Sequence, residues 1–208
     1  FRSLYRFNCY NLLMDNVRGL KKRLTRALRS IGFLQSINWE VFKSGDAESV
    51  ENEIKKLDDI NMPGEKSAPA LFHAIWGGNI VAIRTLLAAG ANPNAEVQYS
   101  HNSNCFSALT VARSSEAFEL LLDAGANPLF FGTGEHSSSN LLHNFFRKKM
   151  TDARLLQRLI SISKDVDVRD SPPVGGIPGD RTPLMIACSH GAGIDLIKIL
   201  INAGADVN

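Results

Sequence analysis

The feature that most constrains this chain is a short motif that occurs three times along it. Each copy has an apolar pair, one variable residue, Ala, Gly, Ala and then Asn or Asp, and the copies lie within 86–94, 121–128 and 200–208. A glycine just past a helix adopts the left-handed conformation that satisfies the last carbonyl groups. The Asn or Asp that follows favours a turn through bonds to nearby backbone. The motif therefore predicts a repeated helix stop.

A helix start precedes each stop. In the clearest copy, residues 182–187, Thr182 can cap the helix and Pro183 takes the first helical position, where its missing N–H costs nothing. Residues 69–74 and 107–112 are weaker copies of this start. Between start and stop the apolar residues follow helical spacing, as within 80–87. The chain is therefore expected to repeat a unit of two short helices.

These motifs resemble the ankyrin repeat, whose signature is Thr-Pro-Leu-His-x-Ala, a central Gly, a Leu pair and Gly-Ala-Asp-x-Asn. The resemblance covers about residues 36–208. It implies an all-α ankyrin-repeat solenoid, in which stacked helix-turn-helix units bury apolar faces that no unit can bury alone. Extended fingers would join the repeats, and residues 1–35 would form a basic amphipathic extension or cap. The predicted repeats are a degenerate 36–61, then 62–94, 95–129, 130–167 and 168–208.

The copies are unequal. The second is three residues short between Ala112 and Gly125, so its first helix is expected to be abbreviated. The spacing of 33 from Asn61 to Asn94 is the family's repeat length, and it supports counting the degenerate first copy. The sequence stops where another repeat would begin. We therefore expect the native protein to continue, with Leu196, Ile199 and Leu200 lacking a next neighbour in these 208 residues.

Three connections between repeats, 94–107, 129–140 and 167–182, exceed the family's length of about eight residues. Either surface loops simply tolerate insertion, or the lengthened fingers shape a partner site. In the family, partners bind beside the fingers in a concave groove over the first helices. Trp76 near basic residues has the composition of a binding hot spot if exposed; alternatively it packs against a neighbouring finger. The predicted partner-binding residues are Trp76, Tyr99, Phe106, Arg147, Lys148, Arg181 and His190.

The reactive side chains do not indicate an enzyme. Cys188 and His190 are two residues apart, so on a helix they would not face each other. Cys188 replaces a small family residue and is expected in the core, and His143 matches the family histidine that bonds to neighbouring backbone. There is no phosphate loop, dinucleotide turn or zinc-protease motif. We therefore predict no catalytic activity, cofactor or metal.

The front of the chain differs from the rest in charge. Residues 1–33 hold eight Arg or Lys and one acid, a balance of +7 against +2 for the whole chain. Apolar residues at three- and four-residue steps from Leu13 to Ile31 predict an amphipathic helix. The residues of its basic face are Arg18, Lys21, Lys22, Arg23, Arg26 and Arg29. This helix either caps the stack or binds an anionic membrane surface. The sequence argues against nucleic acid as the partner, because the aromatic residues are not interleaved with the basic face.

The leading hypothesis is a protein-protein interaction module whose partner cannot be read from the sequence. Irregular repeats with long fingers resemble those of effector proteins that intracellular bacteria deliver into host cells, which implies a host protein as partner. The alternative is a targeting or regulatory domain of a larger enzyme whose catalytic part lies outside residues 1–208. Three cysteines, odd in number and far apart, favour a reducing compartment such as the cytoplasm, or the host-cell cytoplasm for an effector.

Overall fold

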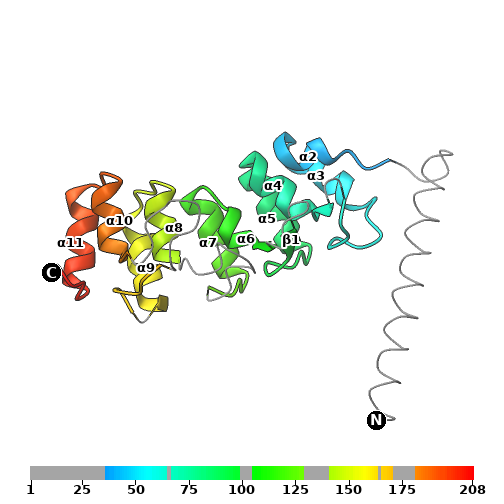
Figure 1. The fold of residues 1–208 in the computed structure, drawn as a ribbon. Helices are drawn as coiled ribbons and strands as arrows, with labels where there is room; N and C mark the ends of the chain where they lie inside the picture. The colour runs from blue at the N-terminus through cyan, green and yellow to red at the C-terminus, as the bar shows by residue number, and fades with distance from the viewer. Residues whose placement is uncertain (1–35, 65–66, 99–104, 129–140, 164, 171–180) are drawn as a thin grey trace, which may run out of the picture. The chain divides into compact units, whose positions relative to one another are not determined.

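A computed structural model describes residues 36–64, 67–98, 105–128, 141–163, 165–170 and 181–208. The chain divides into two units, residues 1–38 and 39–208. All the described helices and strands lie in the second unit (Figure 1). Within the described ranges, no helix has the length and apolar character that crossing a membrane requires.

The second unit is built from helix pairs, with ten helices and two strands in its described part. The helices are α2 (Trp39–Ser44), α3 (Ala47–Ile54), α4 (Ala70–Gly77), α5 (Ile80–Ala88), α6 (Ala108–Val111), α7 (Ser115–Asp123), α8 (Leu141–Arg147), α9 (Ala153–Ser163), α10 (Pro183–Ser189) and α11 (Ile194–Asn202). The strands β1 (Glu96–Gln98) and β2 (Cys105–Ser107) pair antiparallel between α5 and α6. The predicted all-α solenoid of stacked helix pairs is confirmed.

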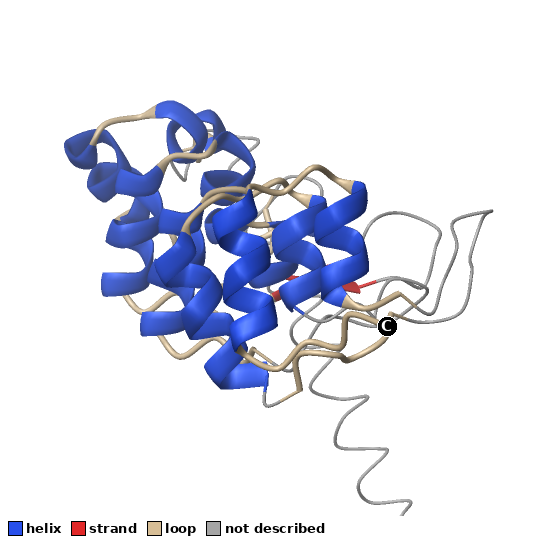
Figure 2. Cartoon of the chain, turned by 90° about the vertical axis from the view of Figure 1, so that its left-hand side faces the viewer, coloured by secondary structure: helices blue, strands red, loops and turns tan. Residues whose placement is uncertain are grey.

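The pairs stack in two layers (Figure 2). The first-helix layer contains α2, α4, α6, α8 and α10, and the second-helix layer contains α3, α5, α7, α9 and α11. Along the first layer α4 packs against α2 and α6, and α8 packs against α10. Along the second layer α5 packs against α3 and α7, and α9 packs against α11. Each helix thus buries its apolar side against its own partner and the neighbouring pairs, as a repeat stack requires.

The helices begin and end where the motifs predict. The Thr182 hydroxyl accepts a hydrogen bond from the Met185 N–H at 3.3 Å, and Pro183 is the first residue of α10. The glycines of the three stop motifs are left-handed, with φ values of 91°, 87° and 96° at Gly90, Gly125 and Gly204. α6 has four residues, whereas α4 and α10 have eight and seven. The missing turn predicted from the spacing is therefore confirmed.

The Asn or Asp that follows each stop ties one repeat to another. The Asn92 N–H donates to Asn61 Oδ1 at 2.7 Å, and the Asn94 side chain donates to the Gly125 carbonyl oxygen at 3.1 Å. The Asp206 N–H donates to the Asp167 carboxylate at 3.0 Å. These bonds span 31 to 39 residues, so the turn residues set the stacking of the repeats as well as the local chain direction.

Two expectations about the last helix pair are wrong. Leu196 and Leu200 are 5% and 0% exposed, because they face α9 and α10 rather than the open end of the stack. Cys188, expected in the core, is exposed. It occupies the position of Ile75 and Phe146 in earlier pairs, which are buried within the stack. The pair α10–α11 is the last that the structure describes, so nothing in the described residues covers this position.

Candidate functional site

Trp76 lies at the edge of an aromatic cluster in the first-helix layer. Its ring centroid is 5.9 Å from that of Phe72 and 5.4 Å from that of His73, in an edge-to-face arrangement with the histidine. On the other side of His73 lies Trp39 of α2, at 5.1 Å. Trp76 is half-buried, and its ring packs on residues of its own helix. Its contact with a partner stays a prediction.

The Lys148 side chain bonds to the backbone at the end of the shortened helix α6. Its Nζ donates hydrogen bonds to the carbonyl oxygens of Thr110 and Ala112, each at 2.5 Å. These carbonyls lie at the end of the shortened helix, where a cation is favoured by the helix dipole. The Lys148 Nζ also lies 5.4 Å from the centroid of the Phe118 ring. A residue predicted to contact a partner thus joins α8 to the preceding repeat.

No carboxylate accompanies this ammonium group in the contacts that the structure describes. Burial, together with the nearby positive charge of Arg113, lowers the pKa of Lys148 from 10.5 to about 8. Arg113 itself is exposed, in the turn between α6 and α7. The sequence reasoning missed Arg113 because it follows the start motif of the shortened copy, where the family's positions are out of register.

Asp170 clamps the base of the last finger. Its carboxylate accepts from the Arg147 guanidinium at 2.5 Å and from the Arg181 N–H at 2.7 Å, and its own N–H donates to the Arg181 carbonyl oxygen at 3.0 Å. That carbonyl also accepts from His143 Nε2 at 3.0 Å. The Asp170 side chain is 3% exposed. The predicted backbone bond of His143 is present, and burial lowers the pKa of this histidine.

This clamp changes the interpretation of two predicted contact residues. The guanidinium groups of Arg147 and Arg181 are 31% and 22% exposed and turn toward the same buried carboxylate. Both arginines therefore hold the point where the connection 171–180 leaves and rejoins the stack. Asp170 was missed because its partners lie 11 and 23 residues away, at a spacing no motif records.

The first finger begins as a short hairpin. Phe106 pairs with Val97 in the β1–β2 register and is half-buried, while Val97 is 2% exposed. Tyr99 lies outside the described residues, and so do the basic residues 18–29 and the connections 129–140 and 171–180. The predictions made for these segments stay predictions.

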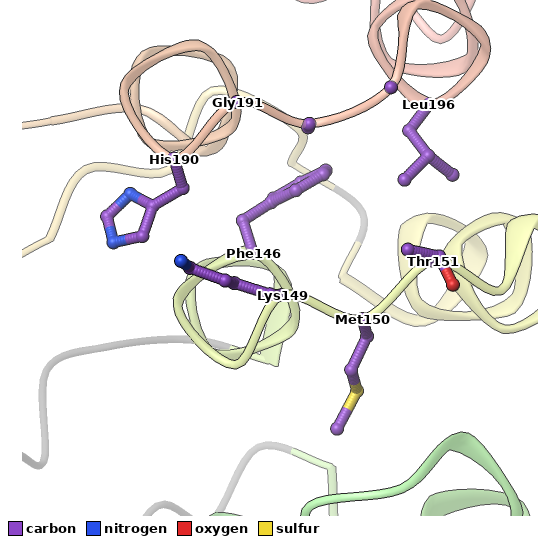
Figure 3. A pocket seen from close by; sticks show the side chains of 9 residues that line it. Phe146, Lys149, Met150, Thr151, His190, Gly191 and Leu196 are labelled. Carbon is purple, nitrogen blue, oxygen red and sulfur yellow. The ribbon is translucent and has the colours of Figure 1, made fainter.

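A hollow opens between the turns that join α8 to α9 and α10 to α11 (Figure 3). It measures about 120 Å³ and is lined mainly by Phe146, Lys149, Thr151, His190 and Leu196. The Nδ1 atom of His190 lies 3.1 Å from the Ile186 carbonyl oxygen. Lys149 is exposed and has a φ of 54°, in the left-handed region where the corresponding turns have Gly78 and Gly191.

Charge is divided between the two helix layers. Among the described helices, the first-helix layer has one acid, Glu40, and this residue pairs with Lys43. The other helical acids belong to the second-helix layer, at Glu48, Glu51, Glu53, Glu116, Glu119, Asp123 and Asp195. Several of these acids pair with cations of their own layer, as Arg158 does with Asp123 at 2.8 Å. The turns that follow the first helices carry the cations Arg113, Lys148 and Lys149 and the acids Asp46 and Asp152. Both acids accept from backbone N–H groups at the start of the second helix.

The described residues contain no cluster of His, Cys, Asp or Glu that could hold a metal ion. Cys105 and Cys188 are free thiols. The polar contacts described above join side chains to backbone or to opposite charges, an arrangement that stabilises turns and fingers. Turns and fingers held in this way present a fixed surface to other molecules.

Comparison with known proteins agrees with this architecture. The ankyrin repeat family model matches residues 179–208. The chain is 25% identical over 173 residues to an ankyrin repeat protein of fowlpox virus, and the match covers 81% of this chain and 36% of the relative. The chain thus spans about a third of the length of that relative. Among solved structures it is similar to the human ASB11 ankyrin repeat domain, with a TM-score of 0.61, 21% identity and coverage of 83% of this chain and 71% of that one.

The chain therefore has the fold of an ankyrin repeat stack, and residues 179–208 match the ankyrin repeat family itself. A stack of this kind is a protein-protein interaction module. The fold is typically a binding scaffold without catalytic chemistry.

Proposed function

We propose that the chain binds a partner protein across its first-helix layer and the β1–β2 finger. The observation that carries this proposal is the division of charge between the layers. The first-helix layer presents Arg113 and Lys149, and an aromatic edge at Trp76, with few acids to repel an acidic partner. Aromatic and basic residues are enriched at the energetic centres of protein interfaces. In the second-helix layer, several acids pair with cations of the same layer.

The test is affinity purification from a eukaryotic cell lysate with mass spectrometry, using wild type, Trp76→Ala, Arg113→Ala and Lys198→Ala. Lys198 is exposed on α11 in the second-helix layer, so its variant is the matched control for the loss of one charge. We expect wild type and Lys198→Ala to recover the same partner, and Arg113→Ala and Trp76→Ala to recover little of it. Equal recovery by all four proteins would overturn the proposal.

Trp76→Ala needs a stability control, because the ring packs on Phe72 and His73. Its thermal midpoint should fall, so the capture is made well below that midpoint. Arg113→Ala has no such complication, since the side chain is exposed. Agreement between the two variants separates lost recognition from lost folding.

We propose further that the partner is a host protein, that the chain acts without catalysis, and that it works in a reducing compartment. The similarity to a protein of a virus, which multiplies inside host cells, supports the first point. The free thiols of Cys105 and Cys188 support the last. Membrane binding by residues 1–33 stays a prediction, tested by vesicle sedimentation with and without that segment.

A further inference from the structure

The hollow between the α8–α9 and α10–α11 turns combines an apolar floor with a cationic rim. Phe146 and Leu196 provide the apolar surface, and both are buried, at 2% and 5% exposure. Figure 3 shows Lys149 and His190 projecting on one side of the hollow, with Leu196 and Thr151 on the other. No acidic residue lines it. The hollow therefore suits a group that is apolar at its tip and negative beside it.

The volume of the hollow limits the size of the group that it can hold. At about 120 Å³, the hollow is smaller than the 300–1,000 Å³ typical of sites for cofactors and drug-sized molecules. One aliphatic side chain fits such a volume. The opening lies at the turns, so a peptide segment could cross it with one residue inserted.

Lys149 is unusual in its position. The corresponding turns after α4 and α10 have glycine, with φ values of 67° at Gly78 and 70° at Gly191. A lysine in the left-handed region is strained, since its Cβ crowds the backbone there. The chain thus keeps a cation at the rim of the hollow where glycine would suit the backbone better. Unlike Lys148, Lys149 is exposed and available to a ligand.

We propose that this hollow anchors an acidic segment of the partner protein by one inserted aliphatic side chain, with Lys149 and His190 facing flanking carboxylates. The inference rests on the proposed function and specifies the chemistry of the partner. Charge complementarity selects the acidic segment, because the lining of the hollow includes Lys149 and His190 and no acid. Asp152, in the same turn, does not line the hollow, and its carboxylate accepts from the N–H groups of Arg154 and Leu155 at the start of α9. Lys149 is a binding residue in this account, and Phe146 forms the floor on which the side chain rests.

Amide NMR with synthetic peptides tests the proposal on the whole chain. The probes are Glu-Glu-Glu-Leu-Glu-Glu-Glu, the same peptide with Ala in place of Leu, and Lys-Lys-Lys-Leu-Lys-Lys-Lys. At millimolar concentration we expect the Glu-Leu peptide to shift the amides of Thr151, Gly191 and Gly193, which line the hollow. The Ala peptide should bind about tenfold more weakly, because it buries less apolar surface. The Lys peptide should leave these amides in place.

Lys149→Gly separates binding from folding. Because glycine suits the left-handed turn, its thermal midpoint should equal or exceed that of wild type, while its affinity for the Glu-Leu peptide falls at least about fivefold. Lys198→Gln, which removes the same charge from the second-helix layer, should bind as wild type does.

Four results would overturn the inference: no shifts with the Glu-Leu peptide, shifts confined to amides away from the hollow, equal shifts with the Leu and Ala peptides, or unchanged binding by Lys149→Gly. Any of these results, together with partner capture that still depends on Arg113, would leave the proposed function standing. Loss of that dependence would refute the proposed function separately.

Discussion

Lys148 offers a measurable consequence of the shortened helix. The folded chain holds its ammonium group with a pKa of about 8, whereas an unfolded lysine has 10.5. The folded pKa is the lower one, so the folded chain releases the proton first as the pH rises. Stability attributable to this group is therefore gained as the pH rises from about 8 towards 10.5, and it is lost again as the pH falls back through 8.

The magnitude follows from the shift. Each pKa unit corresponds to about 1.4 kcal/mol, so at a pH of about 9.5 the full shift would contribute about 2 kcal/mol. Lys148 is partly exposed, and residual contact with solvent reduces the expected gain to about 1–2 kcal/mol. Lys148→Met keeps the aliphatic length, removes the titrating group and should remove this gain.

The assay is urea unfolding of wild type and Lys148→Met at several values between pH 7 and 9.5, with a reducing agent present. The quantity to compare is the difference in unfolding free energy between the two proteins. The contributions of all other groups are common to the two proteins and cancel in this difference. We expect the unfolding free energy of wild type, relative to that of Lys148→Met, to rise by about 1–2 kcal/mol between pH 7 and 9.5. A difference that stays flat with pH would refute the buried tie between Lys148 and α6.

Three further substitutions test other contacts. Gly77→Ala should destabilise the fold by about 1–3 kcal/mol in urea unfolding, because its Cβ would lie 2.4 Å from the Lys43 carbonyl oxygen; Gly193→Ala, with open space at its Cβ, is the control and should not destabilise. Asp170→Asn should lower the free energy of unfolding by about 2–3 kcal/mol, because it removes the ion pair with Arg147. Asp195→Asn, at an exposed position, is the control and should lower it by less than about 0.5 kcal/mol. Equal losses in the two variants would contradict the role of Asp170 at the base of the finger. Lys149→Gly should raise stability by up to about 1 kcal/mol, and a lower thermal midpoint would show that no strain is relieved.

The repeat architecture could be predicted because its signals are local. A cap at Thr182, a proline after it and left-handed glycines at the stops each act within a few residues, so the helix limits follow from the motifs. The shortened α6 required only a count of residues between Ala112 and Gly125. The repeat boundaries drawn from these motifs stay predictions.

The candidate site could not be predicted to the same degree, because its contacts join residues far apart in the sequence. Lys148 reaches backbone 36 and 38 residues earlier, and Arg147 reaches Asp170 23 residues later. Family positions identify which side chains lie near the groove, but they do not indicate which of these are already engaged within the chain. The two alternatives for Trp76 stayed open for the same reason, since the exposure of its ring depends on its packing on Phe72 and His73.

The exposure of Cys188 shows a further limit. Its motif position predicts a small buried residue, and the equivalent residues Ile75 and Phe146 are buried. Burial in a stack comes from the following repeat, however, and α10–α11 is the last pair that the structure describes. The same motif position can therefore be core in one repeat and surface in another.

Photo-crosslinking tests the central claim, that a partner protein occupies the first-helix layer, most directly. A photoreactive amino acid is placed singly at Arg113 or Ser189, which are exposed at the ends of first helices, and at Gln157 or Lys198, which are exposed on second helices. With the partner recovered by wild-type protein, the account predicts crosslinks from Arg113 and Ser189 and none from Gln157 or Lys198. Crosslinks from the second-helix positions alone would contradict it.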